Sequence, residues 1–412
     1  MLTRFLPVTI KRSNFYSLLF LAYIALAFIR AISPDQIINS IASTAIGLYA
    51  FSTVRIDRKL QTLILVFTFS LLFSFLVSSM LNIRLDRIIQ NLMFILSSSG
   101  IALLLTTGLV ALWAVSIAFW GLASYFVILM LLSTDPMLAL FSSQNSISWM
   151  ILAAAISYYL VSNRLNKKLN LKPAFVTLII SIWGVGRSGI LVGFVLLFGL
   201  FFLKSESKVI RTMLITFVML FIFFMAIPLY GSTEQIASFY GFFNDLFFKN
   251  AISNYSKTFD PNYTGRADIN RYYFENMDFF RFFFGVNPRT EYWPGGDLND
   301  YNYHNSFIQL HAQTGFVGLI IMLLLIISFF KFIKRDKVYS LLILSLCLRC
   351  STDGYIFFEF FDFVPLFFIF MLFKTTRITL SRPRKRTDHA AAKADVGSGQ
   401  TLGASPCHQA EA

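Results

Sequence analysis

The chain is poor in charged residues. Only 14% of its 412 residues are Asp, Glu, Lys or Arg, whereas a soluble domain carries about a quarter. Hydrophobic residues make up 56% of the sequence. This composition argues against an ordinary soluble globular protein and predicts a chain that crosses a membrane many times.

Cysteine is scarce, and no internal repeat is visible. The three cysteines, Cys347, Cys350 and Cys407, cannot form a disulfide framework. Cys347 and Cys350 lie in an apolar segment, so we interpret them as packing residues and not as a redox pair. Paired repeats are typical of many transporters, and their absence from the sequence weakens a transport function.

Long apolar runs bounded by charged residues are frequent. About 20 apolar residues cross the hydrocarbon core as a helix. The runs predict an all-α polytopic membrane protein with about twelve spans and one large, partly helical outer loop. The predicted spans are 15–32, 36–54, 60–81, 88–107, 109–131, 147–162, 173–186, 188–203, 212–230, 306–330, 338–351 and 355–373.

The formal net charge of +14 comes largely from basic clusters that fall on one side of this twelve-span arrangement. Basic residues are retained in the cytoplasm, so this side is predicted to face the cell interior, with both termini. The charge therefore reports topology, and we expect no nucleic-acid partner. The clusters begin at Lys11, Arg55, Arg164, Lys204, Lys331 and Arg382.

Four regions follow from this topology. Residues 1–230 hold nine spans, 231–305 form a large outer loop, 306–373 hold three spans, and 374–412 form a basic, disordered cytoplasmic tail. The loop is acidic on balance and rich in aromatic residues. Its segments "IASFYGFFNDLFF" and "RYYFENMDFFRFFFG" predict helices that lie against the membrane surface.

Several arginines stand at the outer ends of spans, against the topology rule. Ionisable residues near the membrane that topology does not explain are candidates for function. With Arg266 of the loop they would form a cationic outer face that suits an anionic ligand. Snorkelling or ion-paired interfacial arginines are the alternative. The span-end arginines are Arg30, Arg84, Arg87, Arg187 and Arg349.

Arg187 and His304 are the strongest single candidates. Glycines flank Arg187 in "GVGRSGI" and would let the backbone turn sharply beside a ligand. From His304 we expect one continuous helix into the membrane, with His311, Gly315 and Gly318 on the buried stripe of His304. An imidazole at an outer cavity can accept a proton near neutral pH, although His304 could instead cap the helix.

Acidic residues near the last two spans complete the pattern. Asp353, Glu359 and Asp362 could pair with the arginines and orient them, or one could serve as a carboxylate base. Asp297 and Asp300 in "GGDLND" have weak spacing for a divalent cation, so we expect no metal site.

The segment "HNSFIQLHAQTGFVG" resembles the His-Asn-x9-Gly-x-x-Gly signature of the O-antigen polymerase and O-antigen ligase family. The layout is similar too, with about twelve spans and a large periplasmic loop directly before the signature. Arg187 and Arg266 match the family's two essential arginines, and Asp353 matches its acidic position in the penultimate periplasmic turn.

The resemblance implies a metal-independent, inverting glycosyltransferase of the bacterial inner membrane, without a cofactor and with a periplasmic active site. Its donor would be an undecaprenyl-pyrophosphate-linked glycan, and its acceptor a second glycan or the lipid A core, with membrane lipids and a chain-length regulator as further partners. The implied catalytic residues are His304, Arg187 and Arg266. The expected substrate-binding residues are Arg84, Arg87, Arg271, Arg289, Arg349, Asp353 and Asn305.

The form of the Gly-Arg-Ser-Gly turn slightly favours a polymerase over a ligase. A flippase or transporter of lipid-linked oligosaccharides is the alternative from another class. A protein O-oligosaccharyltransferase, which carries a similar signature, is the third interpretation.

Overall fold

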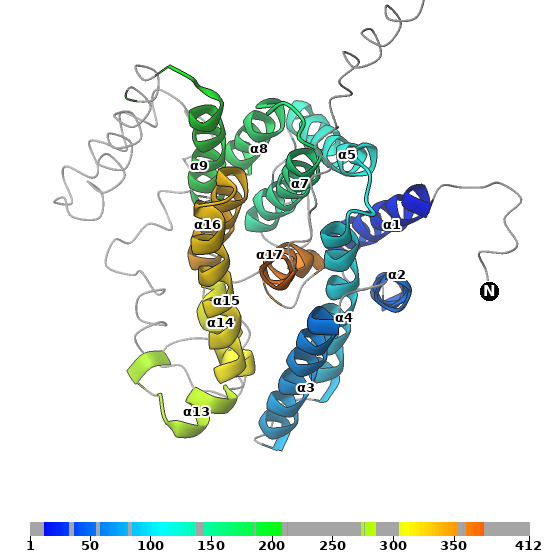
Figure 1. Ribbon diagram of the computed structural model, residues 1–412, viewed down its shortest axis with the longest axis vertical. Coiled ribbons are helices and arrows are strands. Elements are labelled where there is room, and N and C mark those ends of the chain that lie inside the picture. Colours follow the sequence, from blue (N-terminus) through cyan, green and yellow to red (C-terminus); the bar gives the residue numbers. More distant parts are fainter. Residues whose placement is uncertain are drawn as a thin grey trace, which may run out of the picture. The chain divides into compact units, whose positions relative to one another are not determined.

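Helices form the regular structure of the part of the chain that can be described (Figure 1). The computed structural model describes residues 12–32, 37–54, 58–80, 85–132, 144–184, 187–207, 273–275, 277–285, 305–352 and 360–374, with single residues 134, 136, 212 and 357. No strand occurs among these residues, so the all-α class is confirmed.

Eight of the described helices precede the loop region. They occupy the apolar runs that the sequence predicted, and each boundary lies within a few residues of the expected one. The helices are α1 (Arg12–Ile32), α2 (Ile37–Thr53), α3 (Arg58–Met80), α4 (Leu85–Thr107), α5 (Leu112–Leu131), α7 (Gln144–Arg164), α8 (Lys172–Trp183) and α9 (Arg187–Lys204).

The remaining described helices lie within the loop region or follow it. The predicted ninth span, 212–230, and the loop segment "IASFYGFFNDLFF" lie outside the described residues, apart from residue 212. The helices are α13 (Phe279–Phe284), α14 (Ser306–Thr314), α15 (Phe316–Ile333), α16 (Lys337–Thr352), the 3₁₀ helix η2 (Phe360–Asp362) and α17 (Phe363–Phe373).

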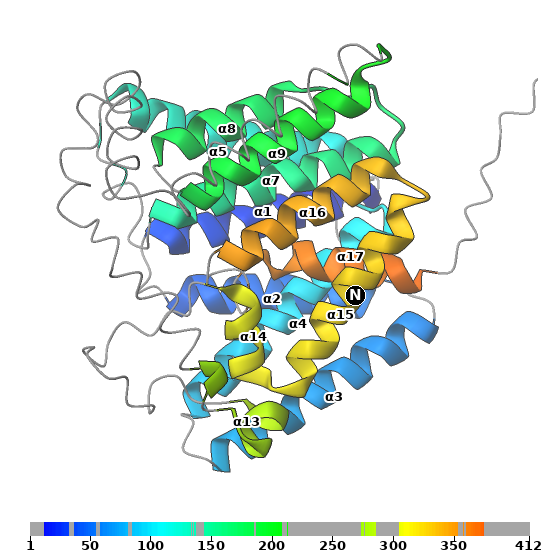
Figure 2. The ribbon, with the colours of Figure 1, turned by 90° about the vertical axis from the view of Figure 1, so that its left-hand side faces the viewer.

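The expected single helix from His304 into the membrane is wrong. The chain breaks at Gly315, where φ is +57°, into α14 and α15, and Figure 2 shows the two helices running in different directions. A Cβ at Gly315 would lie 2.2 Å from the carbonyl oxygen of Phe283. Glycine is therefore needed both for the left-handed backbone and for the close approach of the loop. The break also removes the predicted stripe of His311, Gly315 and Gly318.

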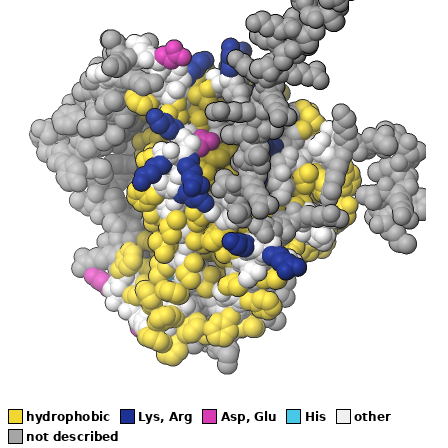
Figure 3. All heavy atoms as spheres, in the orientation of Figure 1, with side chains coloured by type: hydrophobic (Ala, Val, Ile, Leu, Met, Phe, Trp, Pro, Cys, Tyr) yellow, Lys and Arg dark blue, Asp and Glu magenta, His cyan; other side chains and the backbone are white. Residues whose placement is uncertain are grey.

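Hydrophobic side chains cover much of the described surface (Figure 3). Four helices are long and apolar enough to cross a membrane among the residues described, and four shorter apolar helices accompany them. Helix α15 illustrates the pattern, because Leu323, Ile326 and Phe330 along it are exposed. Such faces fit a multi-pass membrane protein, while the number of spans stays a prediction. The four helices cover 13–32, 112–131, 145–164 and 316–333.

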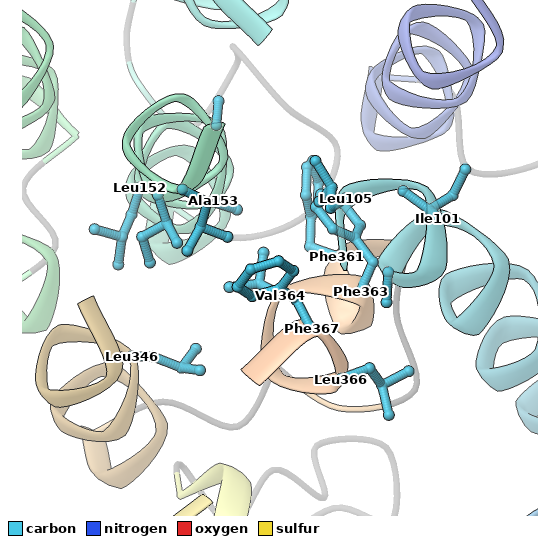
Figure 4. Packing of buried hydrophobic residues seen from close by; sticks show 14 of the residues in the cluster. Ile101, Leu105, Leu152, Ala153, Leu346, Phe361, Phe363, Val364, Leu366 and Phe367 are labelled. Atoms are coloured by element: carbon cyan, nitrogen blue, oxygen red, sulfur yellow. The ribbon is translucent and has the colours of Figure 1, made fainter. Parts of the chain in front are cut away.

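Helix α17 lies in the interior of the bundle. Its residues 363–370 are all buried, as expected of a helix that is apolar on every side. Phe363 and Val364 belong to the cluster in which side chains of α17 lie among those of α4, α7 and α16 (Figure 4). Helix α17 thus packs against α4, α7, α15 and α16.

Helices α2 and α4 pack at very short range. A Cβ at Gly100 would lie 1.9 Å from the carbonyl oxygen of Gly47, and a Cβ at Gly47 would lie 2.2 Å from the Cα of Ser97. Small residues at a helix crossing let backbones approach closely, which is a common means of association within membranes.

Basic side chains join the helix ends at one extremity of the bundle. Arg164, the last residue of α7, donates to the carbonyl oxygens of Leu105 (2.7 Å) and Val110 (2.9 Å). Lys374, after α17, donates to the carbonyl oxygen of Thr106 at 2.7 Å. These cations satisfy the exposed carbonyl groups at the C-terminus of α4, where positive charge is favourable.

Candidate functional site

The structure describes only part of the predicted site. Arg187 is the first residue of α9, and Arg87 lies in the first turn of α4. Arg349 lies near the end of α16, and Asn305 precedes α14. The other predicted site residues lie outside the described residues, as do Glu359, Asp297 and Asp300. They are His304, Arg266, Arg84, Arg271, Arg289 and Asp353.

Arg349 holds three helices together. Its guanidinium Nη1 donates to the hydroxyl of Ser188, which follows Arg187 at the start of α9. Its Nη2 donates to the backbone carbonyl of Asn145, in the first turn of α7, at 2.7 Å. Arg349 therefore links α16 to the helix end that carries Arg187. Sequence reasoning did not identify Ser188 or Asn145, although Ser188 lies directly beside Arg187.

The burial of Arg349 is complete, with 0% of its surface exposed. A buried cation is costly unless hydrogen bonds and protein dipoles replace its water. The Ser188 hydroxyl and the Asn145 carbonyl do so here. In this arrangement the guanidinium faces protein acceptors, so a direct contact between Arg349 and a ligand stays a prediction.

Asn305 of the His-Asn pair is the N-cap of α14. Its Oδ1 accepts hydrogen bonds from the backbone N–H groups of Phe307 (3.0 Å) and Ile308 (3.2 Å). An N-cap side chain satisfies donors that a helix start leaves without partners. The asparagine therefore fixes where α14 begins, at Ser306, two residues after His304.

Helix α14 is held by its neighbours at both ends. At its C-terminus, the carbonyl of Thr314 accepts a hydrogen bond from the hydroxyl of Ser74 in α3 at 2.9 Å. At its N-terminus, the ring of Phe307 contacts the ring of Phe357, with centroids 6.4 Å apart. These contacts give the helix that follows His304 a defined position against α3 and the segment before α17.

His311 connects α14 to the loop. Its Nε2 lies 3.1 Å from the carbonyl oxygen of Phe282, and its Nδ1 is hydrogen-bonded to the hydroxyl of Tyr273. A carbonyl can only accept, so Nε2 carries the proton and, in the neutral ring, Tyr273 donates to Nδ1. His311 is thus a satisfied polar group, and the sequence did not reveal Tyr273 as its partner.

His311 precedes the apolar helix α15 and lies outside the candidate span 316–333. Burial lowers the pKa of His311 below its usual value of 6.5, although the hydrogen bond to the Phe282 carbonyl acts in the opposite direction. The imidazole is therefore neutral in the folded protein at neutral pH.

Arg30, one of the span-end arginines, has protein partners. Its guanidinium lies over the rings of Phe94 (4.7 Å) and Phe360 (4.9 Å), and its Nη1 donates to the hydroxyl of Ser40 at 2.8 Å. Cation–π contacts of this kind stabilise by about 0.5–2 kcal/mol. These contacts link α1, α2, α4 and η2.

Residues 173–323 match the family model of the O-antigen ligases. The matched segment begins at α8 and ends within α15, and it contains Arg187, Arg266, His304 and Asn305. Searches of curated proteins and of solved structures found no match. The matched segment is less than half of the chain, and it supports the resemblance to the O-antigen polymerase and ligase family, a family of enzymes whose substrates are lipid-linked glycans.

Proposed function

We propose that the protein is a glycosyltransferase of the bacterial inner membrane that works at the periplasmic face. It transfers a glycan from undecaprenyl pyrophosphate to a sugar hydroxyl. A surface-polysaccharide polymerase, whose acceptor is another lipid-linked glycan, is slightly favoured over a ligase that uses the lipid A core.

The observation that carries this proposal is the family match over residues 173–323. That single segment encloses the three residues assigned to catalysis, Arg187, Arg266 and His304. Helices α9 and α14, which lie within the segment, both pack against α16. The helices that follow Arg187 and His304 thus pack against one common helix, which supports a shared site.

The chemistry needs one base and a cationic grip on the leaving group. The acceptor hydroxyl attacks the anomeric carbon, the bond from that carbon to the pyrophosphate oxygen breaks, and the configuration inverts. His304 takes the hydroxyl proton. Arg187 and Arg266 neutralise the charge that develops on the pyrophosphate, so the leaving group needs no metal or added proton.

Arg349 serves this site through Arg187. Its hydrogen bond to Ser188 fixes the first turn of α9 and brings the Arg349 guanidinium to that turn. Helix N-termini favour anions because their backbone N–H groups and dipole present partial positive charge. We assign Arg349 a positioning role, while Arg84, Arg87, Arg271, Arg289, Asp353 and Asn305 remain the proposed substrate-binding residues.

Helix α7 supports the proposed orientation. Asn145 at its start accepts a hydrogen bond from Arg349. Arg164 at its end lies with Lys374 at the C-terminus of α4. Nineteen residues separate the two, which corresponds to about 28 Å of helix at about 1.5 Å per residue. This length is close to the roughly 30 Å of a hydrocarbon core. We therefore place Arg164 at the cytoplasmic face and the Arg349 contacts at the periplasmic face.

The surface polysaccharide of a deletion strain, separated on a gel, tests the proposed function. Loss of a polymerase leaves lipid A core with one repeat unit, whereas loss of a ligase leaves bare core. Either result supports glycan transfer and chooses between its two forms. An unchanged ladder in the deletion strain would contradict the proposal.

A further inference from the structure

Helix α13 presents a row of exposed phenylalanines. Phe279 and Phe280 are 68% and 58% exposed, and Phe283 is also exposed. At 100° per residue these three side chains fall within a sector about 100° wide on the helix. Fully burying a phenylalanine is favourable by about 1.5–3 kcal/mol, so leaving all three in water would be costly.

The rest of α13 is fastened to the protein. Asp278 caps the helix by accepting from the backbone N–H of Arg281 at 2.8 Å. The carbonyl of Phe282 is bonded to His311 of α14, and a Cβ at Gly285 would lie 2.2 Å from the carbonyl oxygen of Ala312. The phenylalanine row is therefore held in place on a well-packed support.

Aromatic contacts place α13 at the ends of two apolar helices. The ring of Phe283 lies 5.7 Å from that of Phe316, the first residue of α15. The ring of Phe284 lies 6.4 Å from that of Phe73, which precedes the end of α3 by seven residues, or roughly 10 Å of helix. This distance matches the roughly 5–10 Å to which interfacial helices bury their apolar face.

The exposed row continues onto the outward faces of these two helices. Phe69 and Phe73 of α3 are exposed, as are Phe316 and Ile320 of α15, whose length and composition suit a membrane span. Figure 3 shows hydrophobic side chains gathered over the lower end of the molecule, where Figure 1 places α13. A surface continuous with lipid-facing helices meets the same environment that they meet.

We propose that α13 is an aromatic anchor that inserts Phe279, Phe280 and Phe283 among the acyl chains of the periplasmic leaflet. Asp278 and Arg281, 3.9 Å apart, lie at its polar end, as in interfacial helices. The anchor ties the loop to the membrane beside α14, the helix that begins two residues after His304. This proposal concerns a surface and does not depend on which glycan is transferred.

Nitroxide labelling in lipid nanodiscs tests the anchor. Phe279→Cys and Phe280→Cys are labelled in the full-length protein, with Glu275→Cys as the matched control, because Glu275 is exposed in the same segment. The wild-type chain, labelled in parallel, gives the background from the native cysteines. Relaxation by oxygen, which concentrates in lipid, is compared with relaxation by a water-soluble nickel complex.

We expect the labels at 279 and 280 to be reached by oxygen and not by nickel, and the label at 275 to be reached by nickel. Nickel access at 279 and 280 equal to that at 275 would show that the row faces water. Protection from both reagents would show that protein covers the row. Either of these two results would overturn the proposal.

Discussion

The side chain of Arg349 donates a hydrogen bond to Ser188, the residue that follows Arg187. The two residues are 161 positions apart in sequence and lie in different helices. The fully buried guanidinium of Arg349 therefore contacts the first turn of α9, which carries the proposed catalytic residue Arg187. The contact connects the matched family segment to a helix outside it.

Replacing Arg349 with methionine should reduce glycan transfer by more than tenfold. The change removes the contacts to Ser188 and Asn145 and leaves buried polar groups unsatisfied, which costs about 1–3 kcal/mol of stability. Transfer is measured as polymer per unit of inserted protein. Arg349→Lys should restore insertion but only part of the transfer, because a lysine ammonium cannot reproduce the paired hydrogen bonds of the guanidinium to Ser188 and Asn145.

Ser345→Ala is the control for this experiment. Ser345 is buried in the same helix, and its hydroxyl has no hydrogen-bond partner among the described residues. We expect wild-type transfer from this variant. Wild-type transfer from Arg349→Met would show that the position of the α9 turn does not depend on Arg349.

The N-cap of α14 should separate two roles of Asn305. Asn305→Asp keeps a side-chain oxygen for the N–H groups of Phe307 and Ile308, whereas Asn305→Ala loses it, at a cost of about 0.5–2 kcal/mol. If capping is the main role of Asn305, the melting temperature of Asn305→Asp in detergent will be close to that of the wild type, and that of Asn305→Ala will be lower. If both variants retain the wild-type midpoint, the cap does not contribute.

Much of the helical pattern could be predicted from apolar runs, because length and composition decide where a span lies. The break at Gly315 could not, because the same glycines also fit a stripe of small residues on an unbroken helix. A glycine after Thr314 is also typical of a helix that ends there. The close contact between Gly315 and the backbone of Phe283 decides in favour of the helix end over the unbroken helix. The burial of Arg349 could not be predicted from the sequence either, because its hydrogen-bond partners lie in helices that are distant in sequence.

The stability of the loop contact should depend on pH through His311. Because burial lowers its folded-state pKa below 6.5, the unfolded chain binds more protons than the folded chain just below pH 6.5. The contribution of His311 to stability is therefore complete above pH 6.5 and is lost as pH falls toward the folded pKa. Melting temperatures in detergent should fall between pH 7.5 and pH 5.5.

His311→Gln provides the comparison for this pH series. Glutamine does not titrate, so the fall in melting temperature between the two pH values should become smaller. Tyr273→Phe removes the hydroxyl partner and keeps the imidazole, so a pH dependence should remain. An identical fall in wild type and His311→Gln would assign the effect to other groups.

The crossing of α2 and α4 should tolerate no side chain at Gly100. A methyl group there would meet the backbone of Gly47, so Gly100→Ala should lower the yield of folded protein strongly. Gly121 in α5 is the matched control, because no atom lies within 4 Å of the Cβ position there. Gly121→Ala should fold at least as well as wild type, since alanine favours a helix by about 0.5–1 kcal/mol. Equal yields from both variants would contradict the close packing.

In the proposed mechanism, His304 deprotonates the acceptor hydroxyl while Arg187 binds the pyrophosphate. The most direct test of this mechanism is complementation of the deletion strain with His304→Ala, with membrane insertion checked by immunoblot. We predict normal insertion and a loss of polymer or ligated glycan of at least about 100-fold, the usual contribution of a general base. Near-normal glycan from inserted His304→Ala would contradict it.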